Sequence, residues 1–357
     1  MPALSYSPMS DRQLADQLGV SEHAVALARD ADFLDLHIDS FITTRLVGYA
    51  LHRQHGTGLL GGRFFGQLDF PRAILGGLSG GMWSITTNPF RSEEGRWRTF
   101  LGNLARLRAL VEDTGGACRV VRTFAEYRAA REAGALACLL AIQGGNALSP
   151  RHGYAAAIPG DVITRVTLVH LTHSLYGRSS APVPTRRSGL TDAGRELVRS
   201  LNERRVFVDL AHIHPSAFWD AVEAHDKGQP LLVTHTGVTG VKPHWRNVDD
   251  AQLRAVADTG GVVGIIYQES FLTRPGGPRG VDMVLEHLEH VVRVAGEDAA
   301  AIGSDYDGAI VPPKELRDGL SHPRVVDAML RRGWPEARIR KVLGGNFLRA
   351  FEALRPA

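Results

Sequence analysis

Eight short apolar runs recur along the chain, and longer segments with helical periodicity separate them. The runs lie at 33–38, 81–86, 136–143, 165–171, 205–212, 230–235, 261–267 and 300–305. Most are continuous rather than alternating, which is typical of parallel strands that are covered on both faces. Eight strands in βα alternation predict a (β/α)8 barrel of the TIM type. An open doubly wound sheet is the alternative that periodicity alone does not exclude.

The segments between the runs show the spacing of amphipathic helices. The clearest examples are 93–113, 191–204, 249–259 and 281–295. Thr191 and Asp249 stand at the start of two of these segments, where their side chains are suited to cap a helix. The chain has 357 residues. We therefore expect an N-terminal helical extension over residues 1–30 and a barrel domain over 31–357 that ends in a helical tail.

The composition argues against several classes of partner and location. The net charge of +3 is too small to indicate a nucleic-acid or membrane-surface partner by itself. The two cysteines, Cys118 and Cys138, indicate no disulfide framework. No apolar run reaches the length that spans a bilayer, and the first residues lack the pattern of a signal peptide. A cytoplasmic location is therefore expected.

Polar side chains gather at the carboxyl ends of the predicted strands. They are His37, Asp39, Gln143, His173, His212, His235 and Asp305. In a barrel these strand ends meet at one mouth, where the active site lies. Imidazole and carboxylate groups are ligands of first-row metals, zinc above all. A single histidine at such a position is more often an ordinary buried residue, but the ordered set favours a metal site.

The order of these motifs resembles the renal or membrane dipeptidase family of the amidohydrolase superfamily. The resemblance runs from about residue 30 to 354 and is carried by DLHIDS, LTHSLYG, PLLVTHTG, HWRNVDD and IGSDYDG. The long block from 189 to 222 is its most specific part. The resemblance implies a (β/α)8 barrel with a two-zinc site that hydrolyses dipeptides. It is also compatible with a homodimer.

The resemblance further implies how the ligands divide between two zinc ions. His37 and Asp39 would hold one ion together with Asp305. His212 and His235 would hold the second ion. Two such metals lower the pKa of a water between them and polarise the carbonyl of the substrate.

Three residues would act on the substrate according to the same resemblance. His173 would lie over the substrate and help to polarise the scissile carbonyl. Arg246 would bind the terminal carboxylate of a small dipeptide-like substrate through its planar fork. Asp305 would carry the proton from water to the leaving amine.

At Gln143 the chain departs from the family pattern, which has a glutamate followed by two glycines. In the family, that carboxylate bridges both zinc ions. An amide offers one neutral oxygen, and its nitrogen cannot ligate a cation. Two dications then lose an anion that offset their repulsion. Three outcomes follow: two ions bound more weakly, one ion on either side of the site, or a metal-poor protein with altered activity.

We therefore expect zinc-dependent hydrolysis of dipeptides with one or two zinc ions. The alternative is an impaired or repurposed relative. Such a protein would bind small peptides without turnover or act as a biosynthetic tailoring enzyme.

A segment near the N-terminus, residues 12–30, has the spacing of a helix-turn-helix. Its second helix carries acidic residues and a single arginine, which is unfavourable for contacts with DNA phosphates. We therefore expect two packed helices and no nucleic-acid partner. Burial of Leu14, Leu18, Val25 and Leu27 against the rest of the chain would leave no free DNA-reading module.

Overall fold

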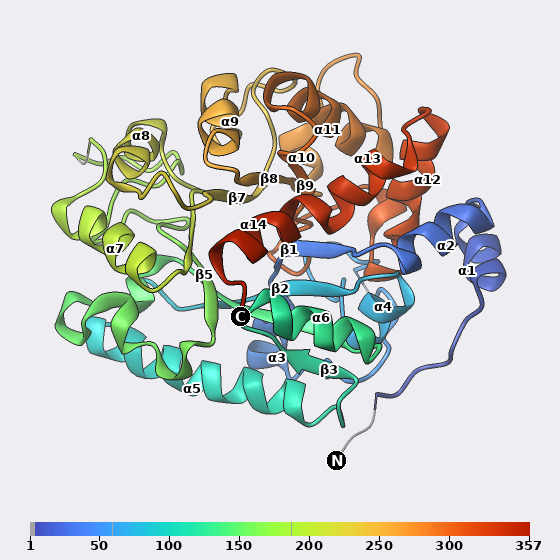
Figure 1. Ribbon diagram of the computed structural model, residues 1–357, viewed down its shortest axis with the longest axis horizontal. Helices are drawn as coiled ribbons and strands as arrows, with labels where there is room; N and C mark the ends of the chain where they lie inside the picture. Colours follow the sequence, from blue (N-terminus) through green and yellow to red (C-terminus); the bar gives the residue numbers. More distant parts are fainter. Residues whose placement is uncertain (1–3, 59, 187) are drawn as a thin grey trace.

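A barrel of parallel strands forms the centre of the computed structural model, which describes residues 4–58, 60–186 and 188–357 (Figure 1). The strands follow one another in the order β1-β2-β4-β5-β6-β7-β8-β9. Their bounds are β1 Leu34–Ile38, β2 Gly80–Thr86, β4 Leu136–Gln143, β5 Ile163–Thr167, β6 Phe207–Asp209, β7 Leu232–Thr236, β8 Val262–Ile265 and β9 Ala300–Ile302. A parallel bridge between Ile38 and Tyr306 joins the two edges, so the barrel is nearly closed. The predicted barrel is confirmed, and the open sheet is excluded.

One short strand lies outside the barrel and was not predicted. It is β3, Cys118–Val120, which pairs with β4 in parallel but does not belong to the series of barrel strands. The helices are α1 Asp11–Leu18, α2 Glu22–Asp30, α3 Ser40–Val47, α4 Phe70–Leu75, α5 Glu93–Glu112, α6 Phe124–Glu132, α7 Asp192–Glu203, α8 Pro215–Ala224, α9 Asp250–Ala257, α10 Glu269–Leu272, α11 Val281–Ala295, α12 Pro323–Arg331, α13 Glu336–Arg340 and α14 Asn346–Leu354. The caps at Thr191 and Asp249 are confirmed, since each side chain accepts a backbone N–H of the first turn.

The two faces of the strands belong to two different cores. In β4, Ala137, Leu139 and Ala141 join the cluster inside the barrel. Cys138 and Leu140 join the larger cluster between the strands and the surrounding helices. Both faces are therefore apolar, which explains why the strand reads as a continuous apolar run. Gln143 continues the inward-facing series at the end of β4.

The C-terminal helix closes the amino-terminal end of the barrel. Phe347 and Phe351 of α14 belong to the same interior cluster as Phe207 of β6 and Leu232 of β7. The ring centroids of Phe207 and Phe351 lie 6.3 Å apart. Figure 1 shows α14 crossing in front of the strands. The predicted helical tail is thus part of the core, and the polar strand ends lie at the opposite mouth.

The two N-terminal helices pack onto the rest of the chain. Leu27 of α2 belongs to the main core, while Leu14, Leu18 and Val25 form a small buried cluster. The backbone N–H of Ser21 donates to Asp327 of α12 at 3.0 Å, and Figure 1 shows α2 beside α12. The apolar residues of the helix-turn-helix pattern are therefore used in packing. In the described residues, no helix is long and apolar enough to cross a membrane.

Candidate functional site

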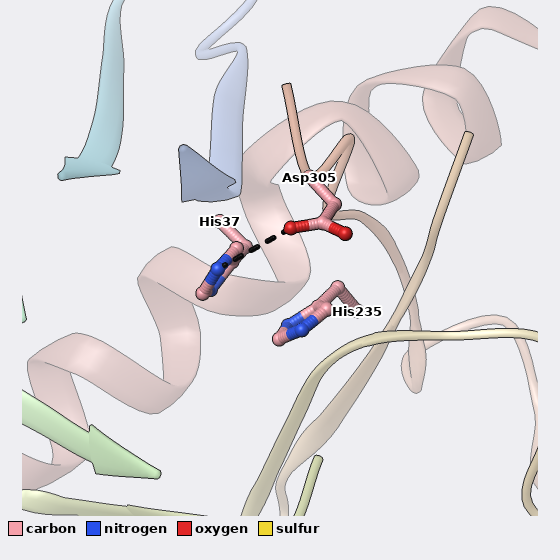
Figure 2. Close-up of side chains that lie close together, drawn as sticks. All are labelled: His37, His235 and Asp305. Atoms are coloured by element: carbon pink, nitrogen blue, oxygen red, sulfur yellow. Dashed lines mark ion pairs between the residues drawn. The ribbon is translucent and has the colours of Figure 1, made fainter. Parts of the chain in front are cut away.

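Five of the predicted ligands meet at the carboxyl-terminal mouth of the barrel. His37, His235 and Asp305 point toward one another (Figure 2), and one ligand atom from each lies within 4.8 Å of the others. The Nε2 atom of His37 lies 3.5 Å from an oxygen of Asp39 and 3.5 Å from an oxygen of Asp305. The Nε2 atoms of His212 and His235 are 2.8 Å apart. These five residues are called the ligand cluster below.

The backbone is irregular at the points where the ligand cluster is attached. The strand register shifts between Asp35 and Ile38 in β1, and again in β7 next to His235. His212 and Asp305 both adopt a left-handed conformation with φ of 63°. Such conformations are costly for residues other than glycine and gather at functional sites. The irregularities turn side chains from four strand ends toward one point.

The two glycines after Gln143 have a backbone explanation. Gly144 has φ of 93°, a conformation that side chains disfavour. A Cβ atom on Gly145 would lie 2.8 Å from the side chain of Leu197 and 2.9 Å from the carbonyl oxygen of Leu168. The turn therefore requires glycine at both positions, and it leaves the amide of Gln143 at the edge of the ligand cluster.

The amide of Gln143 binds to protein groups on both sides. In one orientation of the amide, the nitrogen faces hydrogen-bond acceptors and the oxygen faces a donor. In that orientation the nitrogen faces the two oxygens of Asp39 at 3.0 and 2.9 Å and Nε2 of His37 at 3.0 Å, and the oxygen accepts from His170 Nε2 at 3.0 Å. The opposite orientation would place the amide oxygen against the carboxylate oxygens, which repel it. The residue expected as a metal ligand is thus a hydrogen-bond donor to another predicted ligand.

His173 lies outside the ligand cluster; its predicted place is over the substrate, and that role stays a prediction. Its Nδ1 accepts the backbone N–H of Ser179 at 3.2 Å, and its Nε2 lies 2.9 Å from the carbonyl oxygen of Val183. His170 is the histidine of this segment that reaches the site. Its ring meets that of His212 edge to face, with centroids 4.6 Å apart. His170 was not predicted as a site residue, although it stands at the end of the apolar run 165–171.

Burial sets the protonation states in the ligand cluster. Desolvation lowers the pKa values of His37, His212 and His235, and neighbouring arginines lower those of His212 and His235 further. Neutral imidazole is the form that binds metals. Burial also raises the pKa of Asp305, and the adjacent carboxylate of Asp39 raises it further. A cation between these groups would offset the repulsion between the two carboxylates.

A buried ion pair, which was not predicted from the sequence, lies beneath the ligand cluster. Arg165 of β5 and Asp209 of β6 are fully buried, with a nitrogen and an oxygen 3.4 Å apart. Asp209 also accepts the hydroxyl protons of Thr167 and Thr234, each at 2.7 Å. The signal in the sequence was a charged residue in each of two neighbouring apolar runs. Two opposite charges inside a barrel are expected to form an ion pair, because an unpaired buried charge is costly.

The donor set fits a first-row divalent cation. It combines three neutral imidazoles with the carboxylates of Asp39 and Asp305, and these are the ligand types that zinc prefers. The two nitrogens of His212 and His235 are close enough for one cation to contact both at about 2 Å. Nδ1 of His212 has no hydrogen-bond partner among the described residues.

A cavity of about 410 Å³ opens beside Gln143 and His170. Its wall includes Asn146 and Arg45, and apolar side chains such as Phe90 form its rim. Arg246 is buried nearby and donates from Nη2 to the carbonyl oxygen of His235 at 2.8 Å. Its Nε has no partner among the described residues. Burial lowers the pKa of Arg246 to about 10, so the guanidinium stays charged at neutral pH.

The chain is similar to known proteins over most of its length. The family model of membrane dipeptidases (peptidase family M19) matches residues 21–356. A Klebsiella pneumoniae protein described as an uncharacterized protein in the pqqA 5′ region is 32% identical over 258 residues, which are 70% of this chain and 93% of that protein.

Two solved structures of metallopeptidases superpose over almost the whole chain. A dipeptidase of family M19 is 28% identical with a TM-score of 0.79, covering 92% of this chain and 99% of that one. A metallopeptidase from Rhodobacter sphaeroides, solved with a phosphinate mimic of the dipeptide L-Ala-D-Ala, is 26% identical with a TM-score of 0.78, covering 91% and 99%. The chain therefore belongs to the membrane dipeptidase family, peptidase family M19, whose members are metal-dependent hydrolases of the amidohydrolase superfamily.

Proposed function

We propose that this protein hydrolyses dipeptide-like substrates with a zinc centre in which an amide, Gln143, replaces the bridging carboxylate. The convergence of the ligand cluster beside a cavity of about 410 Å³ carries this proposal. Zinc bound there would supply a Lewis acid and a more acidic water. The retained histidines and carboxylates favour hydrolysis over a purely structural role.

Asp305 is suited to hold and move the proton. Its carboxylate lies 3.5 Å from Nε2 of His37 in the ligand cluster, and its pKa is raised by burial and by Asp39. A carboxylate of raised pKa accepts a proton from water more readily than an ordinary one, and in its protonated form it can give that proton to a leaving amine. We assign the task of contacting the substrate carbonyl to His170 rather than His173, because only His170 lines the cavity beside Gln143.

Two arginines are suited to bind the charged ends of a substrate. Arg246 keeps part of its guanidinium without a partner close to the ligand cluster, which suits the terminal carboxylate of a dipeptide. Arg45 lines the cavity, and its Nη2 makes one long hydrogen bond of 3.3 Å to Thr86. We infer a substrate with two anionic groups or with an acidic side chain. A cytoplasmic location and a homodimer remain predictions from the sequence.

The test is turnover by zinc-supplemented protein. Release of free amino acid from L-Ala-D-Ala, L-Ala-L-Ala and L-Asp-D-Ala is measured for the wild type and for Asp305→Asn. We expect hydrolysis of at least one dipeptide and loss of that activity in the variant.

A second candidate function, peptide binding without turnover, follows from the loss of the carboxylate at position 143. Heat released on mixing with these dipeptides, without any amino acid product, would favour this binder and would contradict the hydrolase.

A further inference from the structure

A second cavity, of about 520 Å³, lies among the loops that follow β5, β6 and β7. Its volume is in the range of small-molecule binding sites. Among the described residues, its wall has no member in common with the cavity beside Gln143. The polar and aromatic part of this wall includes Arg178, Ser180, His214, His244 and Trp245.

Arg178 brings an unpaired positive charge to this second cavity. Its side chain makes no hydrogen bond or ion pair within the part of the chain that the structure describes. The guanidinium lies near His214, since burial and then the charge of Arg178 lower the pKa of that ring. The one carboxylate in the described wall, Asp249, caps α9 by accepting the backbone N–H of Gln252 at 2.8 Å. The amino end of that helix offsets its charge, so the charge of Arg178 is available to a ligand.

Three further polar groups in the wall have unused hydrogen-bonding capacity. Nδ1 of His244 accepts the backbone N–H of Arg246 at 3.2 Å, so the ring is neutral and carries its proton on Nε2. This N–H and Nε2 of His214, whose Nδ1 contacts Ser216, have no partner among the described residues. The buried hydroxyl of Ser180 has none either. A guanidinium with neutral donors around it is suited to a carboxylate or phosphate group.

Apolar side chains line the same cavity. They are Pro182, Val183 and Pro184 of the loop after β5, and Trp245. Val183 and Trp245 are 51% and 40% exposed, although both are large hydrophobic residues. A bare inorganic anion would contact the donors and leave this surface in water. An anion attached to an aromatic ring would cover it as well, which is favourable because apolar area is removed from water.

We propose that this cavity is a second binding site, which takes a small organic oxyanion carried by an aromatic ring. Arg178 pairs with the carboxylate or phosphate group, His244 donates to it from Nε2, and Trp245 packs against the ring. Trp245 and Arg246 are neighbours in the chain but serve different sites, because Arg246 turns inward to the carbonyl oxygen of His235. The inference therefore does not depend on the proposed hydrolysis of dipeptides.

The test is the binding of phenyl phosphate and phenylacetate to zinc-supplemented protein, measured by isothermal titration calorimetry. The two probes have the same ring and different anionic groups, so the tighter one identifies the oxyanion that the site prefers. Benzyl alcohol is the neutral control, and we expect it to bind about tenfold more weakly than the better anion, because it lacks the charge that pairs with Arg178. Failure of both anions to bind would overturn the inference.

Two arginines of the same loop provide matched variants. Arg178→Met should raise the Kd of the better anion about tenfold. Arg186→Met should leave it unchanged, because Arg186 is exposed and does not line the cavity. Trp245→Ala should also weaken binding, and circular dichroism checks that each variant is folded. Equal Kd values for the wild type and Arg178→Met would overturn the inference.

The cavity beside Gln143 is the other place where an aromatic anion could bind, since Arg45 lines it. Arg45→Leu should leave the Kd of the anion unchanged. A loss of binding in Arg45→Leu but not in Arg178→Met would place the anion in that cavity and overturn the inference.

Dipeptide turnover separates this inference from the proposed function. Arg178→Met should retain the turnover of the wild type at saturating dipeptide, while it binds the anion more weakly. Loss of turnover together with anion binding in this folded variant would show that the two ligands use one site and would overturn the inference. Anion binding that depends on Arg178 in a wild type without turnover would contradict the hydrolase and support the second site.

Discussion

Arg165 lies directly behind the imidazole of His37, with its Nη2 2.9 Å from Nδ1. The same guanidinium lies 3.4 Å from Asp209, which reaches His235 through the hydroxyl of Thr234. One buried ion pair therefore acts on two rings that stack with centroids 3.7 Å apart. Its cationic partner donates to Nδ1 of His37, and its anionic partner fixes the hydroxyl of Thr234 so that it accepts from Nδ1 of His235.

Gln143→Glu is expected to raise both zinc content and dipeptide turnover. A carboxylate cannot donate to Asp39, and it adds an anion that attracts a second cation. Elemental analysis and amino acid release measure the two effects. Asn146→Asp is the matched control, because it adds the same charge to the same cavity. Unchanged zinc content and rate in Gln143→Glu would contradict the prediction.

Arg165→Met is expected to lower the free energy of unfolding by about 3–5 kcal/mol, because it leaves Asp209 buried without its ion partner. Urea denaturation of the metal-free proteins measures the change. Arg199→Met is the control: Arg199 pairs with Glu196 on the surface, so its loss should cost no more than about 1 kcal/mol. Equal losses in the two variants would mean that the buried pair does not support the barrel.

The barrel could be predicted because its signal is local. Strand β4 is apolar on both faces, so the run 136–143 is visible without knowledge of its neighbours, and the structure places β4 at Leu136–Gln143. The strand β3 was missed because it has three residues and one of them, Arg119, is exposed. So short a segment has no periodicity to detect.

The ligand cluster was predictable from strand ends, but its finer chemistry was not. His170 and His173 follow the same strand, and only the path of the loop after Thr167 decides which ring reaches the site. The hydrogen bonds at Nδ1 of His37 and His235 come from Arg165 and from the Thr234 hydroxyl held by Asp209. Such contacts between distant segments leave no pattern in a single sequence.

Arg45→Leu is expected to raise the KM for L-Asp-D-Ala about tenfold while changing that for L-Ala-D-Ala little, because a charge-assisted hydrogen bond is lost. The two KM values measured side by side give the result. Arg98→Leu, which removes an exposed arginine paired with Glu94 on α5, is the control. Equal changes in KM for the two substrates would show that Arg45 does not bind the acidic side chain of the substrate.

Phe351→Ala is expected to lower the free energy of unfolding by about 3–5 kcal/mol without changing turnover at saturating zinc. Phe351 is fully buried beneath the barrel and packs against Phe207 and Phe347, at the end opposite the ligand cluster. Urea denaturation and amino acid release measure the two quantities. Glu352→Ala, an exposed neighbour on the same helix, should change stability by no more than about 0.5 kcal/mol. Loss of turnover by Phe351→Ala at full zinc occupancy would contradict the prediction, because it would show that packing at one end of the barrel affects the ligand cluster at the other end.

His287 is expected to make the protein less stable in mild acid. Its Nδ1 accepts the backbone N–H of Val238 at 2.9 Å, and its Nε2 faces the carbonyl oxygen of Leu272 at 3.1 Å, so the native site holds the neutral ring. Burial lowers its pKa from 6.5 to about 4. Between these two values the unfolded chain binds a proton that the native state does not, so the free energy of unfolding falls as the pH falls.

The size of this effect follows from the two pKa values. From pH 7.5 to pH 4, His287 should remove up to about 3 kcal/mol of stability. His287→Gln cannot titrate in this range, and its stability should therefore depend less on pH. Urea denaturation at several pH values measures the difference, with His23→Gln on the exposed face of α2 as the control. Parallel pH curves for the wild type and His287→Gln would show that this ring is not the group that responds, because only a titrating group with different pKa values in the two states can change the slope.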